Sequence, residues 1–307
     1  LQWRCCTPCC WGDNCCNVTI RYTKCILIKE VAIIGELGVD PTLYFIQKKM
    51  KIQNKKLVKW LVEPIIVIIV AIPIYYFACG VGLEKVYSDK GISIYMSDEK
   101  NSEEIKNLAV YVSSKISGID KDFQPNISVY FCNSAIEFHL KTLSMNTPLA
   151  VNRVPLKTIF FRPCDLSTMT IEPREPILVD RKVHDVMLHE VVHNYEWQKL
   201  GVVGFYWKSF REKWKIEGFS EYIADVSSFP INKGIAIFKG DDSYDFVVKN
   251  NVVPEYYYFI SRLRTDYLLK YKGISIEEYW SESYDEDKLD KEIRQAITDS
   301  TYIYPKL

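Results

Sequence analysis

The sequence predicts an α+β fold, in which a mixed sheet with helices is followed by a largely helical half. Two observations lead to this prediction. First, residues 84–182 contain short runs rich in β-branched and aromatic residues, which are typical of strands, together with segments of helical spacing. Second, helical spacing dominates from residue 183 onward. A third observation, the uncharged run from Ile65 to Leu83, predicts one transmembrane helix that precedes both halves.

Residues 1–49 have an unusual composition. Seven of the ten cysteines lie in the first 25 residues, as three doublets and the single Cys25, with no histidine nearby. The first methionine is Met50, and a basic stretch follows it, which is typical of the start of a membrane-targeted protein. We therefore expect residues 1–49 to be a non-native or dispensable extension rather than a disulfide or zinc module.

Residues 50–83 are predicted to form a basic cytoplasmic segment and a transmembrane anchor. The run of 19 uncharged positions approaches the length that crosses a bilayer, and four lysines precede it. Under the positive-inside rule, the N-terminus is cytoplasmic and residues 84–307 are extracytoplasmic, in a single-pass protein of the cell membrane. Two alternatives remain open, a buried core helix and a cleaved signal peptide, with Cys79 as a lipoprotein cysteine.

Local patterns predict the elements in order. In the α/β half, residues 84–182, strands are expected at 86–96, 127–132, 157–161 and 176–180, and helices at 99–117 and 134–143. In the helical half, residues 183–307, helices are expected at 183–199, 206–228, 254–272 and 286–297.

The segment VMLHEVVHNYEW, residues 186–197, carries the most specific chemistry. His189 and His193 are four positions apart, so a helix places both imidazoles on one face, as two ligands of one metal ion require. Glu190 lies beside that face, where its carboxylate can act as general base on a metal-bound water. Only four histidines occur in the chain, which disfavours the alternative of two core histidines spaced this way by chance.

A catalytic zinc ion needs a third protein ligand and one open position. The pattern HExxHxxGxxH is excluded, because Glu196 and Lys199 stand where its glycine and third histidine would be. The later segment WKIEGFSEYIAD instead resembles the third-ligand segment of the gluzincin metallopeptidases, in a branch of uncharacterised bacterial peptidases of the peptidase-MA-like type. This resemblance implies a zincin-like fold that binds Zn²⁺, with Glu217 as the third ligand and Glu221 orienting a ligating histidine. The alternative for both glutamates is a solvated helix face.

The resemblance covers residues 184–226 and is confined to the two motifs. Twenty-three residues separate His193 from Glu217, a few more than in the family, which predicts an inserted turn around Gly201–Gly204. The Gly-x-Met-Glu-Asn motif of the membrane aminopeptidases is absent from the sequence, so the resemblance gives no support for amino-terminal exopeptidase specificity.

These observations predict a membrane-anchored zinc metallopeptidase, a hydrolase that cleaves peptide bonds with zinc-activated water and Glu190 as general base. The expected partners are a peptide or protein substrate and the membrane. The formal net charge of zero gives no reason to expect a nucleic acid. The alternative is a catalytically inactive zincin-like binding or sensing module at the membrane surface, against which the presence of Glu190 argues.

Two features of the catalytic site are left open by the sequence. The donor to the oxyanion is not assigned among Tyr256, Tyr257, Tyr258 and Arg262, because a tyrosine-rich segment also suits packing. An edge strand for pairing with an extended peptide is expected at 157–161 or 176–180.

Overall fold

The computed structural model describes residues 80–97, 102–143, 148–171 and 181–304, with the single positions 62, 71 and 179. The elements that follow belong to one unit, Tyr76–Leu307. The extension predicted at residues 1–49 and almost all of the anchor predicted at 50–83 lie outside the described residues. Within the described ranges, no helix combines the length and the apolar character that crossing a bilayer requires.

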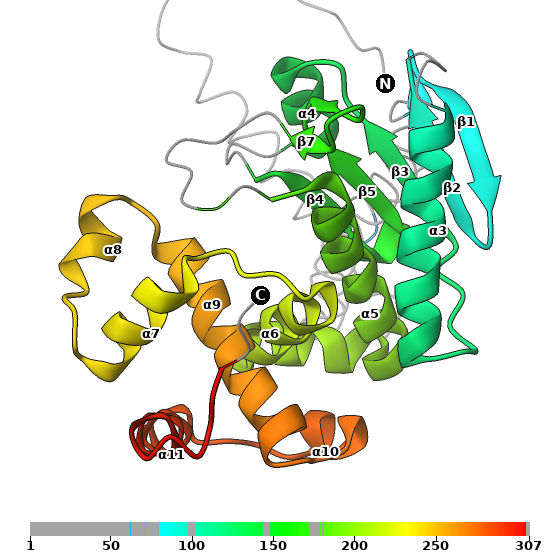
Figure 1. Cartoon of the computed structure of the whole chain (residues 1–307). Coiled ribbons are helices and arrows are strands. Elements are labelled where there is room, and N and C mark those ends of the chain that lie inside the picture. Colours follow the sequence, from blue (N-terminus) through cyan, green and yellow to red (C-terminus); the bar gives the residue numbers. More distant parts are fainter. Residues whose placement is uncertain are drawn as a thin grey trace, which may run out of the picture. The chain divides into compact units, whose positions relative to one another are not determined.

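The first half of the unit is built on a five-stranded mixed sheet (Figure 1). Its strands are β1 (Glu84–Asp89), β2 (Ile92–Met96), β3 (Ile127–Phe131), β4 (Ala150–Arg153) and β5 (Thr158–Phe161), in the order β1-β2-β3-β5-β4. The central strands β2, β3 and β5 run parallel, and the edge strands β1 and β4 are antiparallel to their neighbours. The predicted α+β class with a mixed sheet is confirmed.

Several strand predictions are corrected by the structure. Residues 86–96 form a hairpin rather than one strand, because Lys90 and Gly91 both adopt positive φ and reverse the chain. The predicted strand at 157–161 is β5, which pairs on both sides and is therefore not an edge. The edge strand next to β5 is β4, which the sequence did not indicate. The strand predicted at 176–180 lies, apart from Val179, outside the described residues.

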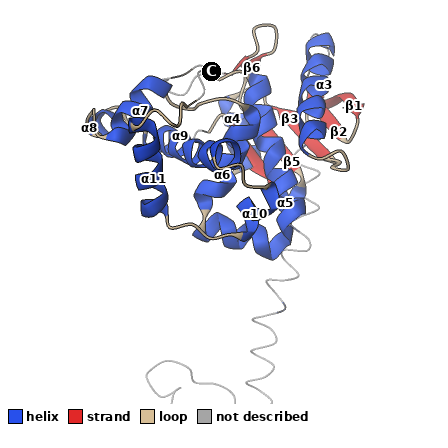
Figure 2. Ribbon diagram, turned by 60° about the horizontal axis from the view of Figure 1, so that its bottom comes forward, coloured by secondary structure: helices blue, strands red, loops and turns tan. Residues whose placement is uncertain are grey.

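One face of the sheet packs against α3 (Ser102–Ile119) and α5 (Val183–Arg211), which lie side by side in Figure 1. Alternate strand residues such as Ile94, Val129 and Ile159 are fully buried in the core that these helices complete. The other face carries a row of stacked rings, with Tyr130 at 4.6 Å from Tyr95 and 5.3 Å from Phe160 between ring centroids. A short helix, α4 (Ala135–Thr142), lies at one end of the sheet (Figures 1 and 2).

The second half is helical, as predicted. It contains α6 (Lys213–Ala224), α7 (Ile231–Lys239), α8 (Asp245–Lys249), α9 (Val253–Asp266), a π-helical turn (Tyr267–Tyr271), α10 (Ile276–Ser281) and α11 (Glu286–Thr298). The inserted turn expected around Gly201 is confirmed, since Gly201 has φ 69° and interrupts α5. The single helix predicted at 206–228 is wrong, because Glu212 leaves helical geometry and separates the end of α5 from α6.

The contact between α6 and α9 depends on a residue without a side chain. A Cβ atom on Gly218 would stand 2.3 Å from the Ser261 carbonyl oxygen and 2.4 Å from Thr265 Oγ1. Only glycine therefore lets the two helices approach this closely. This contact fixes the position of Glu217, the neighbour of Gly218 in the sequence, above α5.

Candidate metal centre

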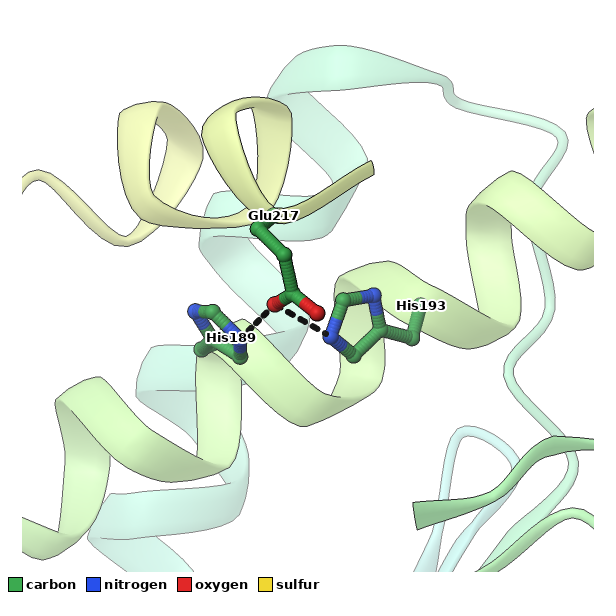
Figure 3. A group of neighbouring side chains, drawn as sticks. All are labelled: His189, His193 and Glu217. Carbon is green, nitrogen blue, oxygen red and sulfur yellow. Dashed lines mark ion pairs between the residues drawn. The ribbon is translucent and has the colours of Figure 1, made fainter. Parts of the chain in front are cut away.

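The two motifs of the sequence meet between α5 and α6. Figure 3 shows the Glu217 carboxylate between the His189 and His193 imidazoles. One carboxylate oxygen, Glu217 Oε2, lies 3.5 Å from His189 Nε2 and 3.7 Å from His193 Nε2. The structure thus brings together the three residues that the sequence predicted as metal ligands.

Two of the three spacings between these atoms are close to those of a tetrahedral zinc site. Ligand atoms at about 2.0–2.1 Å from a tetrahedral ion are separated from one another by about 3.3–3.4 Å. The two distances to Glu217 Oε2 are close to this value, and the three ligand atoms lie within 4.8 Å of one another. Among the residues that the structure describes, His189, His193 and Glu217 are the group of potential metal ligands whose ligand atoms all lie this close together.

Each imidazole also faces a buried carboxylate with its second nitrogen. His189 Nδ1 lies 3.1 Å from Glu221 Oε1, and His193 Nδ1 lies 2.8 Å from Glu196 Oε2. Both glutamates are completely buried. A proton on Nδ1 that is donated to a carboxylate leaves the lone pair on Nε2, which is the form of histidine that binds a metal ion.

Glu196 is the residue of this site that sequence reasoning missed. It was used to exclude a motif, although its position three residues after His193 on the same helix is a spacing at which side chains meet. The Ser220 hydroxyl donates to Glu196 Oε1 at 3.2 Å and lies 3.1 Å from His193 Nδ1. Ser220 therefore connects α6 to the second histidine of α5.

Glu221 is held by two further groups besides His189. The Arg181 guanidinium lies 2.9 Å from Glu221 Oε1, and the Ser228 hydroxyl donates to Oε2 at 3.0 Å. Burial raises the pKa of this carboxyl, but Arg181 and the contact with His189 outweigh burial and lower it to about 2. Glu221 is therefore ionised, as an acceptor of the His189 Nδ1 proton must be.

The buried carboxylates favour a positive charge between the helices. Burial lowers the pKa of the His189 imidazole, but the nearby Glu217 and Glu221 carboxylates, at 3.5 and 3.1 Å from its two ring nitrogens, outweigh burial and raise it to about 10. Burial, followed by the charge of Glu217, raises the pKa of Glu196 well above its usual range. A cation beside Glu217 would offset this repulsion between carboxylates, so the local charge distribution favours a bound cation.

Known proteins do not identify a family for this chain. No family model, no curated protein and no solved structure matches it. The gluzincin resemblance accordingly stays a prediction from two motifs, and the chemistry of the site has to be argued from its own side chains.

Glu190 lies on α5 between the two histidines and is partly exposed. Burial and the charge of His189 lower the pKa of His193, and the Glu190 charge opposes this shift; the same charge adds to the raised pKa of Tyr258, after Glu217 and burial. The Glu190 backbone carbonyl accepts hydrogen bonds from the Asn152 and Asn194 side chains, the first of them from β4. The edge strand therefore lies directly beside the HExxH turn.

Among the four candidates for the oxyanion donor, Tyr258 makes a ring contact with one of the two histidines. Its ring centroid is 6.2 Å from that of His189, and the Glu217 carboxylate, together with burial, raises the pKa of its phenol above its ordinary range. The phenol therefore keeps its proton at neutral pH. The other three have different neighbours: Tyr256 packs against Phe229, Tyr257 lies under the Lys213 ammonium, and Arg262 pairs with Asp225.

Proposed function

We propose that this chain is a zinc-dependent peptidase of the gluzincin type, with His189, His193 and Glu217 as the zinc ligands. The main support is the approach of both Nε2 atoms to one Glu217 oxygen, at 3.5 and 3.7 Å. The carboxylates on both Nδ1 atoms add to it, because they orient the two rings for metal binding. Histidines buried only for packing would not need this arrangement.

The residues around the ligands suit hydrolysis. A zinc ion bound here would lower the pKa of its water towards about 7 and polarise a substrate carbonyl. With such a water in place, Glu190 would act as general base and would return the proton to the leaving amine. Tyr258, which stays protonated next to His189, donates a hydrogen bond to the carbonyl oxygen as that atom becomes negative.

The free edge of β4 supports a peptide as the substrate. β4 pairs with β5 on one side, and the described residues supply no strand on its other side. The hydrogen bond from Asn152 of β4 to the Glu190 carbonyl brings this edge beside the catalytic glutamate. An extended peptide could therefore add to the sheet with its backbone and present a peptide bond to the site.

The membrane anchor is a further proposal, made from the sequence. An uncharged run of 19 residues behind four lysines is expected to hold the peptidase at the cell membrane, with residues 84–307 outside the cytoplasm. Protease treatment of sealed cells that express the full chain should then digest the peptidase unit. Digestion of this unit only after permeabilisation would contradict the orientation.

The catalytic proposal is tested with the full chain and its Glu190→Gln variant. Metal analysis should find about one zinc ion per chain in both proteins, and a mixed peptide library should be cleaved by the parent alone. Glu277→Gln is a matched control, since Glu277 is 73% exposed and its carboxylate contacts Lys199. A His189→Asn variant should lose the metal.

Two results would contradict the catalytic proposal in different ways. A Glu190→Gln variant that cleaves peptides as fast as the parent would refute the role of this carboxylate. A parent chain that binds zinc but cleaves no peptide would favour the binding or sensing module instead.

A further inference from the structure

The end of α5 beyond Gly201 exposes large apolar side chains. Val202, Val203, Tyr206, Trp207 and Phe210 are 56, 81, 52, 63 and 82% exposed. At about 100° per residue, these five positions fall within an arc of about 140° around the helix. We call them the aromatic face of α5. A contiguous apolar stripe on a protein surface marks an interaction site more often than single, scattered apolar residues do.

The opposite side of this helical segment packs against the part of α5 before Gly201 and makes further contacts along the helix itself. Phe205 is buried and its ring lies 5.6 Å from that of Trp197. Lys208 pairs with Glu212 at 2.6 Å, and the Ser209 hydroxyl donates to the Phe205 carbonyl. The aromatic face is therefore held outward by its own helix and does not depend on a loose loop.

The chain at the end of α5 is rich in cationic residues. The Arg211 guanidinium lies 5.7 Å from the centre of the Trp207 ring. Residues 208–215 carry four cationic side chains, Lys208, Arg211, Lys213 and Lys215, against the single carboxylate of Glu212. This segment therefore has a net positive charge.

We propose that the aromatic face of α5 docks on the surface of a phospholipid bilayer that contains anionic lipids. Tryptophan and tyrosine favour the bilayer interface, and helices that lie in it combine an apolar face with lysine and arginine at its border. The positive charge of residues 208–215 complements anionic headgroups.

Docking of this kind does not depend on peptidase activity. It concerns residues 202–213, which lie outside the metal centre, and it would hold for an inactive binding module as well. Failure of the catalytic test and failure of the docking test are therefore distinguishable.

Trp207 itself reports on the proposed contact. The full chain is reconstituted into vesicles of phosphatidylcholine and phosphatidylglycerol, with or without bromine on the acyl chains, and tryptophan emission is compared between parent and Trp207→Phe. The difference between these two proteins isolates Trp207 from the other six tryptophans. We expect brominated lipid to reduce the Trp207 emission by about half or more, since an interfacial ring lies within reach of the upper acyl chain.

Matched variants test the role of the aromatic face. Phe210→Glu should abolish quenching of Trp207, because it places a charge in the middle of the face. Val248→Glu is the control: Val248 is 58% exposed on α8, which lies apart from α5 in both Figures 1 and 2, so quenching should persist. Circular dichroism of each variant shows that it is folded.

Three results would overturn the proposal. The first is Trp207 emission that brominated lipid does not change. The second is equal quenching in pure phosphatidylcholine, which would remove the argument from charge. The third is chemical cross-linking of two chains through residues 202–210 with no quenching, which would identify a second copy of the chain as the occupant.

Discussion

The contact between α6 and α9 gives the most direct test of how the fold positions Glu217. The change is Gly218→Ala. An alanine inside a helix normally stabilises it by about 1 kcal/mol relative to glycine. Here the new Cβ atom would stand 2.3 Å from the Ser261 carbonyl oxygen. An ordinary van der Waals contact begins near 3.4 Å, so α6 and α9 must separate by about 1 Å.

Overpacking of this kind costs about 1–3 kcal/mol, which exceeds the gain in helix propensity. We therefore expect Gly218→Ala to lower the unfolding midpoint of the metal-free chain. Gly118→Ala is the control, since nothing lies within 4 Å of a Cβ atom at Gly118 in α3, and it should leave the midpoint unchanged or raise it. Thermal unfolding, followed by near-ultraviolet circular dichroism in the presence of a chelator, measures both.

The displacement should also reach the metal centre. Glu217 Oε2 lies 3.5 and 3.7 Å from the two Nε2 atoms, so a shift of about 1 Å spoils a tetrahedral arrangement. Competition with a chromogenic chelator should therefore show weaker zinc binding by Gly218→Ala and unchanged binding by Gly118→Ala. A Gly218→Ala chain as stable as the parent, with the same zinc affinity, would refute this account of the α6–α9 contact.

Three further predictions concern single side chains. Glu221→Gln removes the ionised partner of His189 Nδ1, and chelator competition should show zinc affinity lowered about 10- to 100-fold; an affinity equal to that of the parent would exclude the orienting role. Tyr258→Phe should lower the turnover of peptide cleavage about 10²- to 10³-fold while zinc stoichiometry stays at one, and unchanged turnover would remove Tyr258 as the donor. Burial raises the pKa of the Cys164 thiol from 9.0 to about 12, so alkylation at pH 8 should be about 10³-fold slower in the folded chain than after denaturation. Equal alkylation rates before and after denaturation would show that Cys164 is not buried. Because the folded-state pKa of this thiol is the higher one, the thiol also favours the folded state below about pH 9, and it loses that contribution as the pH rises towards about 12.

The part of the site that α5 carries was predictable, because its residues lie close together in the sequence. His189, Glu190 and His193 lie within five residues of one helix, and the helical repeat alone decides which of their side chains share a face. The strands at 127–131 and 158–161 were predictable for the same reason, since each is a short β-rich run between turns.

Two features of the sheet, the β1–β2 hairpin and the strand β4, were not predicted from the sequence. The hairpin of β1 and β2 was missed because its turn, Lys90–Gly91, contains a lysine at positive φ, which does not stand out as a turn residue. The edge strand β4 was missed because its four residues, Ala150–Arg153, are too few and too polar for a strand pattern.

The sequence by itself predicted the candidate metal ligands and the candidate general base, because residue type and helical spacing indicate His189, Glu190 and His193, and the resemblance of a second motif indicates Glu217. The tertiary structure decided which of them meet. Two breaks, at Gly201 and Glu212, turn the chain back and bring Glu217 to histidines more than twenty residues away, while Gly218 lets α9 bring Tyr258 beside them. Such contacts depend on the path of the backbone between distant segments, and that path is fixed by the packing of the whole core, which no local pattern contains.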